Sequence, residues 1–222
     1  MGTPAPVTDG STQRLSAARA ALLRWFDAAK RPLPWRGLGD PYAIWVSEVM
    51  CQQTRVDTAS PYFLRWMARF PTVQTLAAAS EDDVLRAWQG LGYYRRARAL
   101  HAAARVVVRD HDGVLPRSVD ALRNLPGVGD YTAGAVASIA FGVVAPAVDG
   151  NVTRVLARWL DEPRSMEKQA LRDLQRVAAA FADAPSPGDV NQALMELGAT
   201  TCSPKTPRCN QCPLGNTCRA FA

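Results

Sequence analysis

The sequence has little lysine, no long apolar run and few segments that resemble strands. Only Lys30, Lys168 and Lys205 are lysines among its 26 basic residues, and no stretch is long enough to cross a bilayer. Residues 1–14 lack an apolar core, which excludes a secretory signal, and Pro6 stands where an acylation site needs Ser or Thr. We therefore expect a cytoplasmic protein without membrane attachment, with a disordered tail over residues 1–13.

The other 23 basic residues are arginine, and the formal net charge is +6 over 222 residues. This charge is compatible with a polyanionic partner but does not require one. Arginine offers a planar fork that binds phosphate with two hydrogen bonds. Genomic base composition is the alternative explanation, and the alanine-rich sequence favours it.

Apolar residues recur at helical spacing along most of the chain, which predicts an all-α fold. Prolines separate the periodic segments. The short apolar run at 143–148 contains Pro146 and is expected to be a linker. Helices are expected at 14–29, 41–56, 60–69, 81–89, 93–110, 118–124, 130–141, 151–160, 167–183 and 188–200.

Four of the five cysteines lie near the end of the sequence, at Cys202, Cys209, Cys212 and Cys218. Thiolates bind soft metals, and one loop with this spacing can surround an iron–sulfur cluster. Zinc sites more often pair two close knuckles, and only Cys209 and Cys212 are close here, so zinc is the less favoured alternative. A disulfide framework fits poorly without secretion. Cys51 stands apart and is expected to be a small buried residue.

A glycine-bearing turn at Leu125–Gly129 separates two helical patterns. Such a turn presents backbone N–H groups at the start of the next helix, where a phosphate can bind. An ordinary helix connection is the alternative that the turn alone favours.

Two acidic residues, Glu48 and Asp149, occupy positions in the sequence that suit a catalytic role. On a helical wheel of about 100° per residue, Glu48 falls between Ile44 and Trp45, beside Val49, Gln52 and Val56. Desolvation of a carboxyl group favours its protonated form, which suits a general acid. A Glu that reaches solvent or pairs with Arg at the edge of the apolar stripe explains the pattern equally well.

Asp149 precedes a clear helix, where a helix cap is the simpler interpretation. Tyr131 follows the turn, and packing of a half-buried aromatic ring explains it equally.

Seven motifs occur in order: LPWR (33–36), SEVMCQQT (47–54), GLGYYRRAR (90–98), LPGVGDYTAG (125–134), VDGNVTRV (148–155), NQALMELGA (191–199) and the four-cysteine loop. Together they resemble the helix-hairpin-helix DNA glycosylases, and within them the branch that removes adenine. The resemblance covers nearly the whole chain beyond residue 30. It implies a base-excision-repair enzyme, nucleoid-associated if bacterial, that acts as a monomer on double-stranded DNA with adenine opposite 8-oxoguanine or guanine.

The resemblance also implies residue roles. Glu48 would protonate the departing adenine and help to activate water, Asp149 would stabilise the oxocarbenium-like sugar, and Tyr131 would line the site. Tyr93 would enter the base stack, and Thr54 and Leu91 would lie by the opposite 8-oxoguanine. The adenine pocket would be formed by Arg31, Trp35, Gln53 and Val56, with Gln192 near it, and further DNA contacts would come from Gln52, Leu125, Gly127, Val128 and Gly129.

The implied architecture has two helical lobes with the active site in the cleft between them. A six-helix barrel spans 32–143, and a lobe of 14–31 and 144–222 carries a [4Fe–4S] cluster on the four cysteines. Strand-cutting members of the superfamily carry Lys where Tyr131 stands, so efficient lyase activity is not expected. Full-length adenine-removing members have a further C-terminal domain that helps to recognise 8-oxoguanine, and this sequence ends four residues after Cys218.

Two rival functions remain. A thymine or uracil glycosylase acting on guanine mismatches resembles the same fold, although Gln52–Thr54 and Gly90–Tyr94 favour the adenine branch. A non-catalytic DNA-binding module with an iron–sulfur cluster is the second, and the presence of both Glu48 and Asp149 argues against it.

Overall fold

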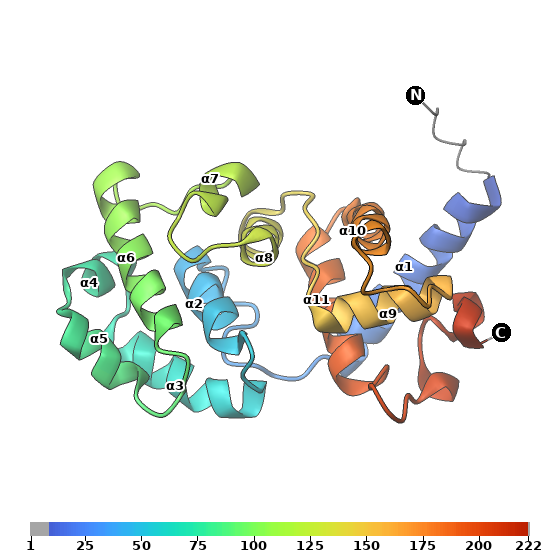
Figure 1. Cartoon of the computed structure of the whole chain (residues 1–222), viewed down its shortest axis with the longest axis horizontal. Helices are drawn as coiled ribbons and strands as arrows, with labels where there is room; N and C mark the ends of the chain where they lie inside the picture. The colour runs from blue at the N-terminus through green and yellow to red at the C-terminus, as the bar shows by residue number, and fades with distance from the viewer. Residues whose placement is uncertain (1–8, 222) are drawn as a thin grey trace. The chain divides into compact units, whose positions relative to one another are not determined.

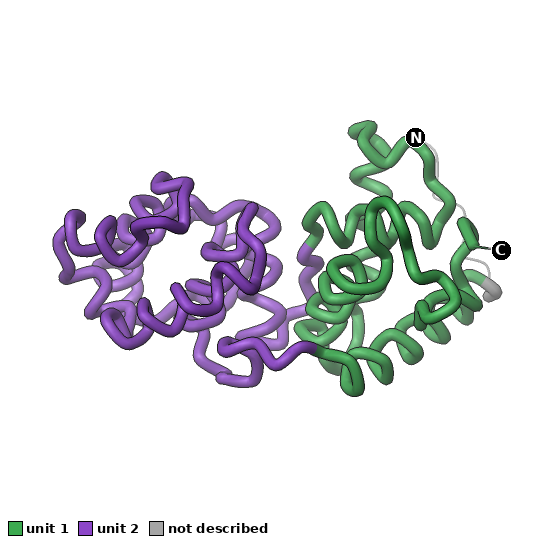
Figure 2. The backbone as a smooth tube through the Cα atoms, turned by 90° about the horizontal axis from the view of Figure 1, so that it is seen from below, with its two compact units in different colours: residues 1–30, 148–222 green, residues 31–147 purple. Residues whose placement is uncertain are grey.

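The computed structural model describes residues 9–221, which form eleven α-helices and three short 3₁₀ helices and contain no strand (Figure 1). The expected all-α fold class is therefore confirmed. The helices group into two compact units. Unit 2 is the continuous segment 31–147, and unit 1 combines residues 1–30 with residues 148–222 (Figure 2).

Unit 2 is organised around its first helix, α2. This helix packs against α3, α6 and α8, while α6 also packs against α4 and α5. The helices of the unit are α2 (Pro41–Cys51), α3 (Val56–Arg69), α4 (Val73–Ala78), α5 (Glu81–Trp88), α6 (Arg95–Asp110), α7 (Val119–Arg123) and α8 (Asp130–Phe141).

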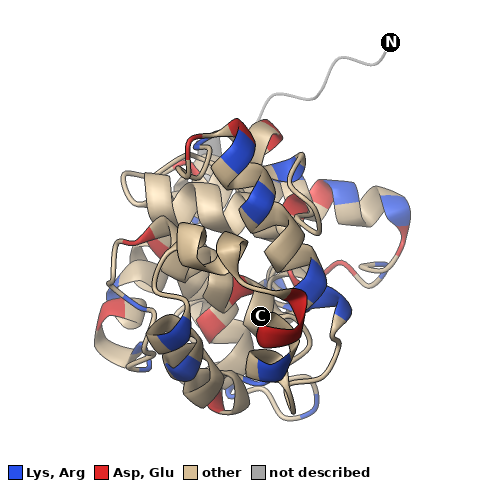
Figure 3. Cartoon of the chain, turned by 90° about the vertical axis from the view of Figure 1, so that its left-hand side faces the viewer, with Lys and Arg blue, Asp and Glu red and all other residues tan. Residues whose placement is uncertain are grey.

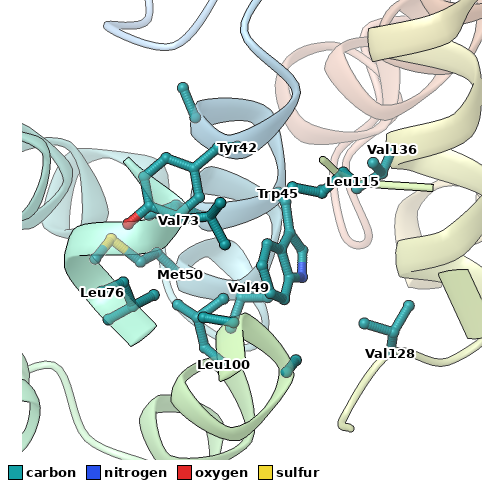
Figure 4. Packing of buried hydrophobic residues seen from close by; sticks show 14 of the residues in the cluster. Tyr42, Trp45, Val49, Met50, Val73, Leu76, Leu100, Leu115, Val128 and Val136 are labelled. Carbon is teal, nitrogen blue, oxygen red and sulfur yellow. The ribbon is translucent and has the colours of Figure 1, made fainter. Parts of the chain in front are cut away.

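Large aromatic side chains fill the core of unit 2. Trp45, Trp66 and Trp88 are almost completely buried, and Trp66 meets Trp88 edge to face at 5.4 Å between ring centroids. In the close view of this core, Trp45 lies beside Val49 on α2 (Figure 4). Replacing one such ring by alanine typically costs about 3–5 kcal/mol, so this packing fixes the position of α2.

Unit 1 joins segments from distant parts of the chain. Its helices are α1 (Asp9–Ala29), α9 (Gly150–Leu160), α10 (Lys168–Ala182) and α11 (Pro187–Thr200), followed by η1 (Cys209–Gln211), η2 (Gly215–Thr217) and η3 (Arg219–Phe221). α1 packs against α11, and α11 packs against α9 and α10. Leu22 and Phe26 of α1 are buried in the same apolar cluster as Leu156, Phe181 and Leu194.

Short polar residues and glycine set the helix ends. The Asp40 carboxylate accepts a hydrogen bond of 3.0 Å from the backbone N–H of Tyr42, and Pro41 occupies the first position of α2. Both features favour a helix start. α8 ends at Gly142, whose φ of +66° is the left-handed conformation that glycine adopts without strain.

Three expected helix boundaries were wrong, and one helix was not predicted. The helix expected at 41–56 ends at Cys51, because the backbone turns at Gln53 with φ +56°. α3 therefore begins at Val56 rather than at residue 60, and Val56 does not share the helix of Glu48. α4 was not expected. α1 is helical from Asp9, so residues 9–13 are not a disordered tail, while residues 1–8 of that expected tail lie outside the described residues.

Residues 142–149 adopt no regular structure, which confirms the linker expected at 143–148. Among the described helices, none combines the length and apolarity that a membrane span requires. Lys and Arg positions are interspersed with Asp and Glu along the helices (Figure 3).

Candidate active site and cysteine loop

Glu48 is the exception on a buried helix. The eight other residues from Tyr42 to Met50 are buried, and Glu48 is half-buried. The rest of α2 packs into the aromatic core of unit 2, so the Glu48 carboxylate projects from a helix whose position is fixed. Rigid placement of this kind is what a reacting group needs.

Tyr131, in the first turn of α8, reaches this carboxylate. Its hydroxyl donates a hydrogen bond of 2.7 Å to Oε2 of Glu48. This distance is typical of a well-formed O–H···O hydrogen bond. Two residues proposed from separate motifs are thus in direct contact within unit 2.

The turn at Leu125–Gly129 connects α7 to α8 and places Tyr131. Gly127 has φ +75°, and a Cβ atom there would lie 2.5 Å from Cβ of Ala99, so only glycine fits. The side chains of Leu125 and Val128 are buried in the core of unit 2. Their backbone N–H groups donate hydrogen bonds of 3.1 Å to the carbonyls of Leu122 and Leu125, so both residues stabilise the turn itself.

The expected DNA-contacting side chains differ in exposure. Tyr93 is 61% exposed and has φ +50°, whereas Leu91 is only 6% exposed and belongs to the core. Gln53 is exposed at the turn between α2 and α3. The side-chain amide of Gln52 donates to Oγ1 of Thr132 at 3.0 Å, which ties this turn to α8, and Thr54 is half-buried beside it.

The residues expected to line a base pocket are only partly brought together. Trp35 is buried and meets Phe63 edge-on at 5.3 Å. Arg31 is half-buried, and both it and Glu48 lie near enough to Cys51 to act on the pKa of its thiol. Burial is the larger cause, and the pKa of Cys51 rises to about 12. Val56 is half-buried at the start of α3.

Gln192 belongs to unit 1. It lies on α11, where its side-chain amide donates to the carbonyl of Gly188 at 3.4 Å. Its side chain is half-buried. The expected position of Gln192 beside the base pocket stays a prediction.

Asp149 caps α9 in unit 1. One carboxylate oxygen accepts a hydrogen bond of 2.7 Å from the backbone N–H of Val152, and the other accepts one of 3.0 Å from the side chain of Asn151. The helix-cap interpretation of Asp149 is therefore confirmed. A cap does not exclude a second role, because the side chain remains half-buried and oriented by its neighbours.

Arg154 extends this network and was missed by sequence reasoning. It donates to Oδ1 of Asn151 at 2.8 Å and to the backbone carbonyl of Cys202 at 2.9 Å. A line of hydrogen bonds thus runs from the Asp149 carboxylate to the start of the cysteine loop. Both residues belong to the motif VDGNVTRV, and their one-turn spacing on a helix could have indicated the contact.

The four cysteines of the loop line one cavity of about 160 Å³, together with apolar side chains that include Trp159 and Leu214. Each is a half-buried free thiol. Burial first, then the neighbouring cysteines, raise the pKa of Cys212 to about 11. In the described part of the chain, no three His, Cys, Asp or Glu side chains approach closely enough to share one metal ion.

Arginines hold the loop in place. Arg158 donates to Sγ of Cys202 at 3.4 Å and to the carbonyl of Ser203 at 2.7 Å. Arg14 of α1 donates to the carbonyl of Thr217 at 2.8 Å and stacks over the ring of Trp159 at 3.8 Å. Arginines from two helices, α1 and α9, therefore hold the loop by hydrogen bonds, and its four cysteines line one cavity.

An all-helical chain with a glycine turn between two helices, a half-buried carboxylate beside that turn and a four-cysteine loop defines the helix-hairpin-helix class. The family model for HhH-GPD superfamily base excision DNA repair proteins matches residues 46–180. The chain belongs to this superfamily.

Several relatives are known by function. An adenine DNA glycosylase of Homo sapiens is 48% identical over 219 residues, which cover 93% of this chain and 40% of the relative. An adenine DNA glycosylase of Mycolicibacterium smegmatis is 46% identical over 210 residues, which cover 92% of this chain and 70% of the relative. The chain thus spans about two fifths of the human relative's length.

Among solved structures, a thermostable thymine-DNA glycosylase superposes with a TM-score of 0.87 at 27% identity. The match covers 96% of this chain and 99% of that one.

Proposed function

We propose that this chain is an adenine DNA glycosylase that turns adenine out of a mispaired duplex and hydrolyses its N-glycosidic bond. The observation that carries the proposal is the hydrogen bond from Tyr131 to Glu48, because it orients a half-buried carboxyl group beside the helix-hairpin-helix turn. The names of the relatives at 46–48% identity support adenine as the base.

In the proposed reaction, Glu48 protonates the leaving adenine, which is a poor leaving group as an anion. The Glu48 carboxylate then takes a proton from the water that adds to the sugar carbon in place of the base. Asp149 stabilises the positive charge that develops on the sugar. Backbone N–H groups at the Leu125–Gly129 turn hold the DNA backbone at a phosphate. Tyr131 is a phenol rather than an amine, so the enzyme releases the base and leaves the strand intact.

We also propose that Cys202, Cys209, Cys212 and Cys218 hold a [4Fe–4S] cluster. A cuboidal cluster needs four thiolates around a void that holds its iron and sulfide atoms. A single zinc ion instead needs the four sulfur atoms to converge on one point, each about 2.3 Å from the metal. The cavity of about 160 Å³ that all four cysteines line suits the cluster. When bound, the group supplies a rigid core for the loop, and the loop's basic residues Lys205, Arg208 and Arg219 would then face a phosphate backbone.

A second candidate has one specific observation in its favour. The likeness to a thymine-DNA glycosylase, with a TM-score of 0.87 over nearly the whole of that chain, supports removal of thymine or uracil opposite guanine. The greater identity to adenine-specific relatives favours adenine.

Single-turnover base release from three duplexes separates these functions. The duplexes carry adenine opposite 8-oxoguanine, adenine opposite guanine, or thymine opposite guanine. We expect release of free adenine from the first two and none from the third. Release of thymine alone would assign the second candidate, and absence of release from all three would leave a DNA-binding module.

A further inference from the structure

Arg96 caps the helix that carries Glu48. Its Nη1 atom donates to the carbonyl oxygens of Val49 and Met50, both at 3.0 Å, and also to that of Gln52. The last turn of a helix leaves such carbonyls without partners inside the helix. A cation there also interacts favourably with the negative end of the helix dipole. One guanidinium group thus fixes the end of α2.

The same side chain reaches a second turn. Its Nη2 atom donates to Oγ1 of Thr54 at 3.1 Å, and to the carbonyl oxygens of Gly92 and Leu91 at 3.3 and 3.5 Å. The guanidinium carbon also lies 5.3 Å from the ring centroid of Tyr93. Arg96 therefore bridges the turn after α2 and the turn before α6.

Both turns hold a residue in a conformation that side chains disfavour. Gln53 has φ +56° and Tyr93 has φ +50°. Left-handed backbone at a non-glycine residue persists only where the surroundings enforce it. The Arg96 side chain donates hydrogen bonds to residues that flank both positions, so one planar fork contacts the two turns together.

We propose that Arg96 is a positioning residue that locks these two turns into one DNA-facing arrangement and so lowers the cost of base extrusion. The inference rests on the proposed function. It also uses the roles expected from the sequence, in which Tyr93 enters the base stack, Thr54 lies by the opposite base and Gln53 lines the adenine pocket. It assigns Arg96 to the step that brings the base out of the helix, not to cleavage of the glycosidic bond.

The first test is backbone hydrogen exchange in the free protein, without DNA. The variants are Arg96→Met, which keeps the chain length, and Arg96→Lys, which keeps the charge but loses the fork. The matched control is Arg98→Met, because Arg98 lies on the same helix and pairs with Glu81 at 2.9 Å. We expect faster exchange at residues 52–55 and 90–94 in both Arg96 variants only, with α10 unchanged. Wild-type exchange in those two segments would overturn the proposal.

The second test compares two substrates under single-turnover conditions. One is a duplex with adenine opposite guanine, and the other carries adenine in an unpaired bulge, where little stacking is lost on extrusion. We expect Arg96→Met to slow adenine release about 100-fold on the duplex, but by less than about threefold on the bulge. Equal losses on both substrates would overturn the role in extrusion, as would recovery of wild-type behaviour by lysine.

The two tests separate the two proposals. If the wild-type protein released no adenine from either substrate, the proposed function would fail. Hydrogen exchange would still decide whether Arg96 locks the two turns. Thermal unfolding of each variant identifies a loss caused by global destabilisation, and Arg96→Lys provides the conservative variant if Arg96→Met does not fold.

Discussion

The Tyr131 hydroxyl and the Glu48 carboxylate are joined by a hydrogen bond of 2.7 Å across 83 positions of sequence. The bond fixes one carboxylate oxygen and leaves the orientation of the group dependent on a neighbouring helix. Removing the hydroxyl is therefore a direct measure of what this orientation contributes.

Tyr131→Phe keeps the ring and removes the donor. We expect single-turnover adenine release to fall about tenfold, the size of effect that one lost hydrogen bond produces. Affinity for the mismatched duplex should stay within a factor of about two, because phosphate contacts dominate binding. A gel-shift assay beside the rate measurement checks both points. An unchanged rate would mean that the bond has no part in orienting Glu48.

Tyr131→Lys tests why the wild-type protein should leave strands intact. The wild-type chain has no lysine in the motif at 125–134, since its lysines are at positions 30, 168 and 205. We expect little covalent capture by borohydride with the wild-type protein and weak capture with the variant, because an amine can form a Schiff base with the abasic sugar. Efficient wild-type cutting before alkali treatment would contradict this account.

Glu48→Gln removes the acid, Asp149→Asn removes the negative charge, and both keep the side-chain shape. Each should slow excision by two or more orders of magnitude, roughly the effect of losing an acid or an electrostatic stabiliser. Asparagine caps helices about as well as aspartate, so Asp149→Asn should fold normally. Asp149→Ala is the control, and it should also lower the free energy of unfolding by about 1 kcal/mol. Near wild-type excision by either isosteric variant would show that its role is structural.

Metal analysis tests the cysteine loop. Protein purified without oxygen should contain iron and sulfide, and Cys212→Ser should lower both the iron content and the melting temperature. Cys51→Ser is the matched control, because Cys51 belongs to unit 2 and should leave the iron content unchanged. One zinc per chain without iron would refute the cluster.

Cys51 should make stability depend on alkaline pH. Burial, followed by the nearby Glu48 charge, raises the pKa of its thiol from 9.0 to about 12. The folded state therefore holds its proton where the unfolded state loses it, and this stabilisation is full below pH 9 and lost as pH rises toward 12. Relative to Cys51→Ala, the wild type should lose about 1 kcal/mol of unfolding free energy by about pH 10. Urea unfolding of both proteins across this range measures the difference, and parallel curves would disprove it.

Sequence periodicity predicted most helices because each has an apolar face that its unit buries. It failed where long-range contacts decide the backbone. The helix expected to continue to residue 56 ends at Cys51, since Arg96 takes the carbonyls of its last turn and Gln53 adopts a left-handed conformation. Helical spacing around residue 48 gives no sign of an arginine 48 positions further on.

Helix α4 was not predicted from the sequence for a different reason. It is six residues long, too short for an apolar period to emerge, although Thr72 and Thr75 form a reciprocal capping box that marks its start. For the candidate site, separate motifs indicated Glu48 and Tyr131 individually. Their contact could not be predicted, because spacing along a chain carries no information about which helices become neighbours.

The discontinuous make-up of unit 1 has a consequence for how the chain acquires its structure. During synthesis α1 emerges more than 150 residues before α11, the helix that packs against it. Unit 2 is complete in one continuous segment and can close while translation proceeds. The side chains of Leu22 and Phe26 therefore stay without their α11 packing partners until more than 150 further residues have been synthesised. Helix α1 is therefore made before unit 2 but packs after it, and until α11 is made the nascent chain exposes an apolar surface that can promote aggregation.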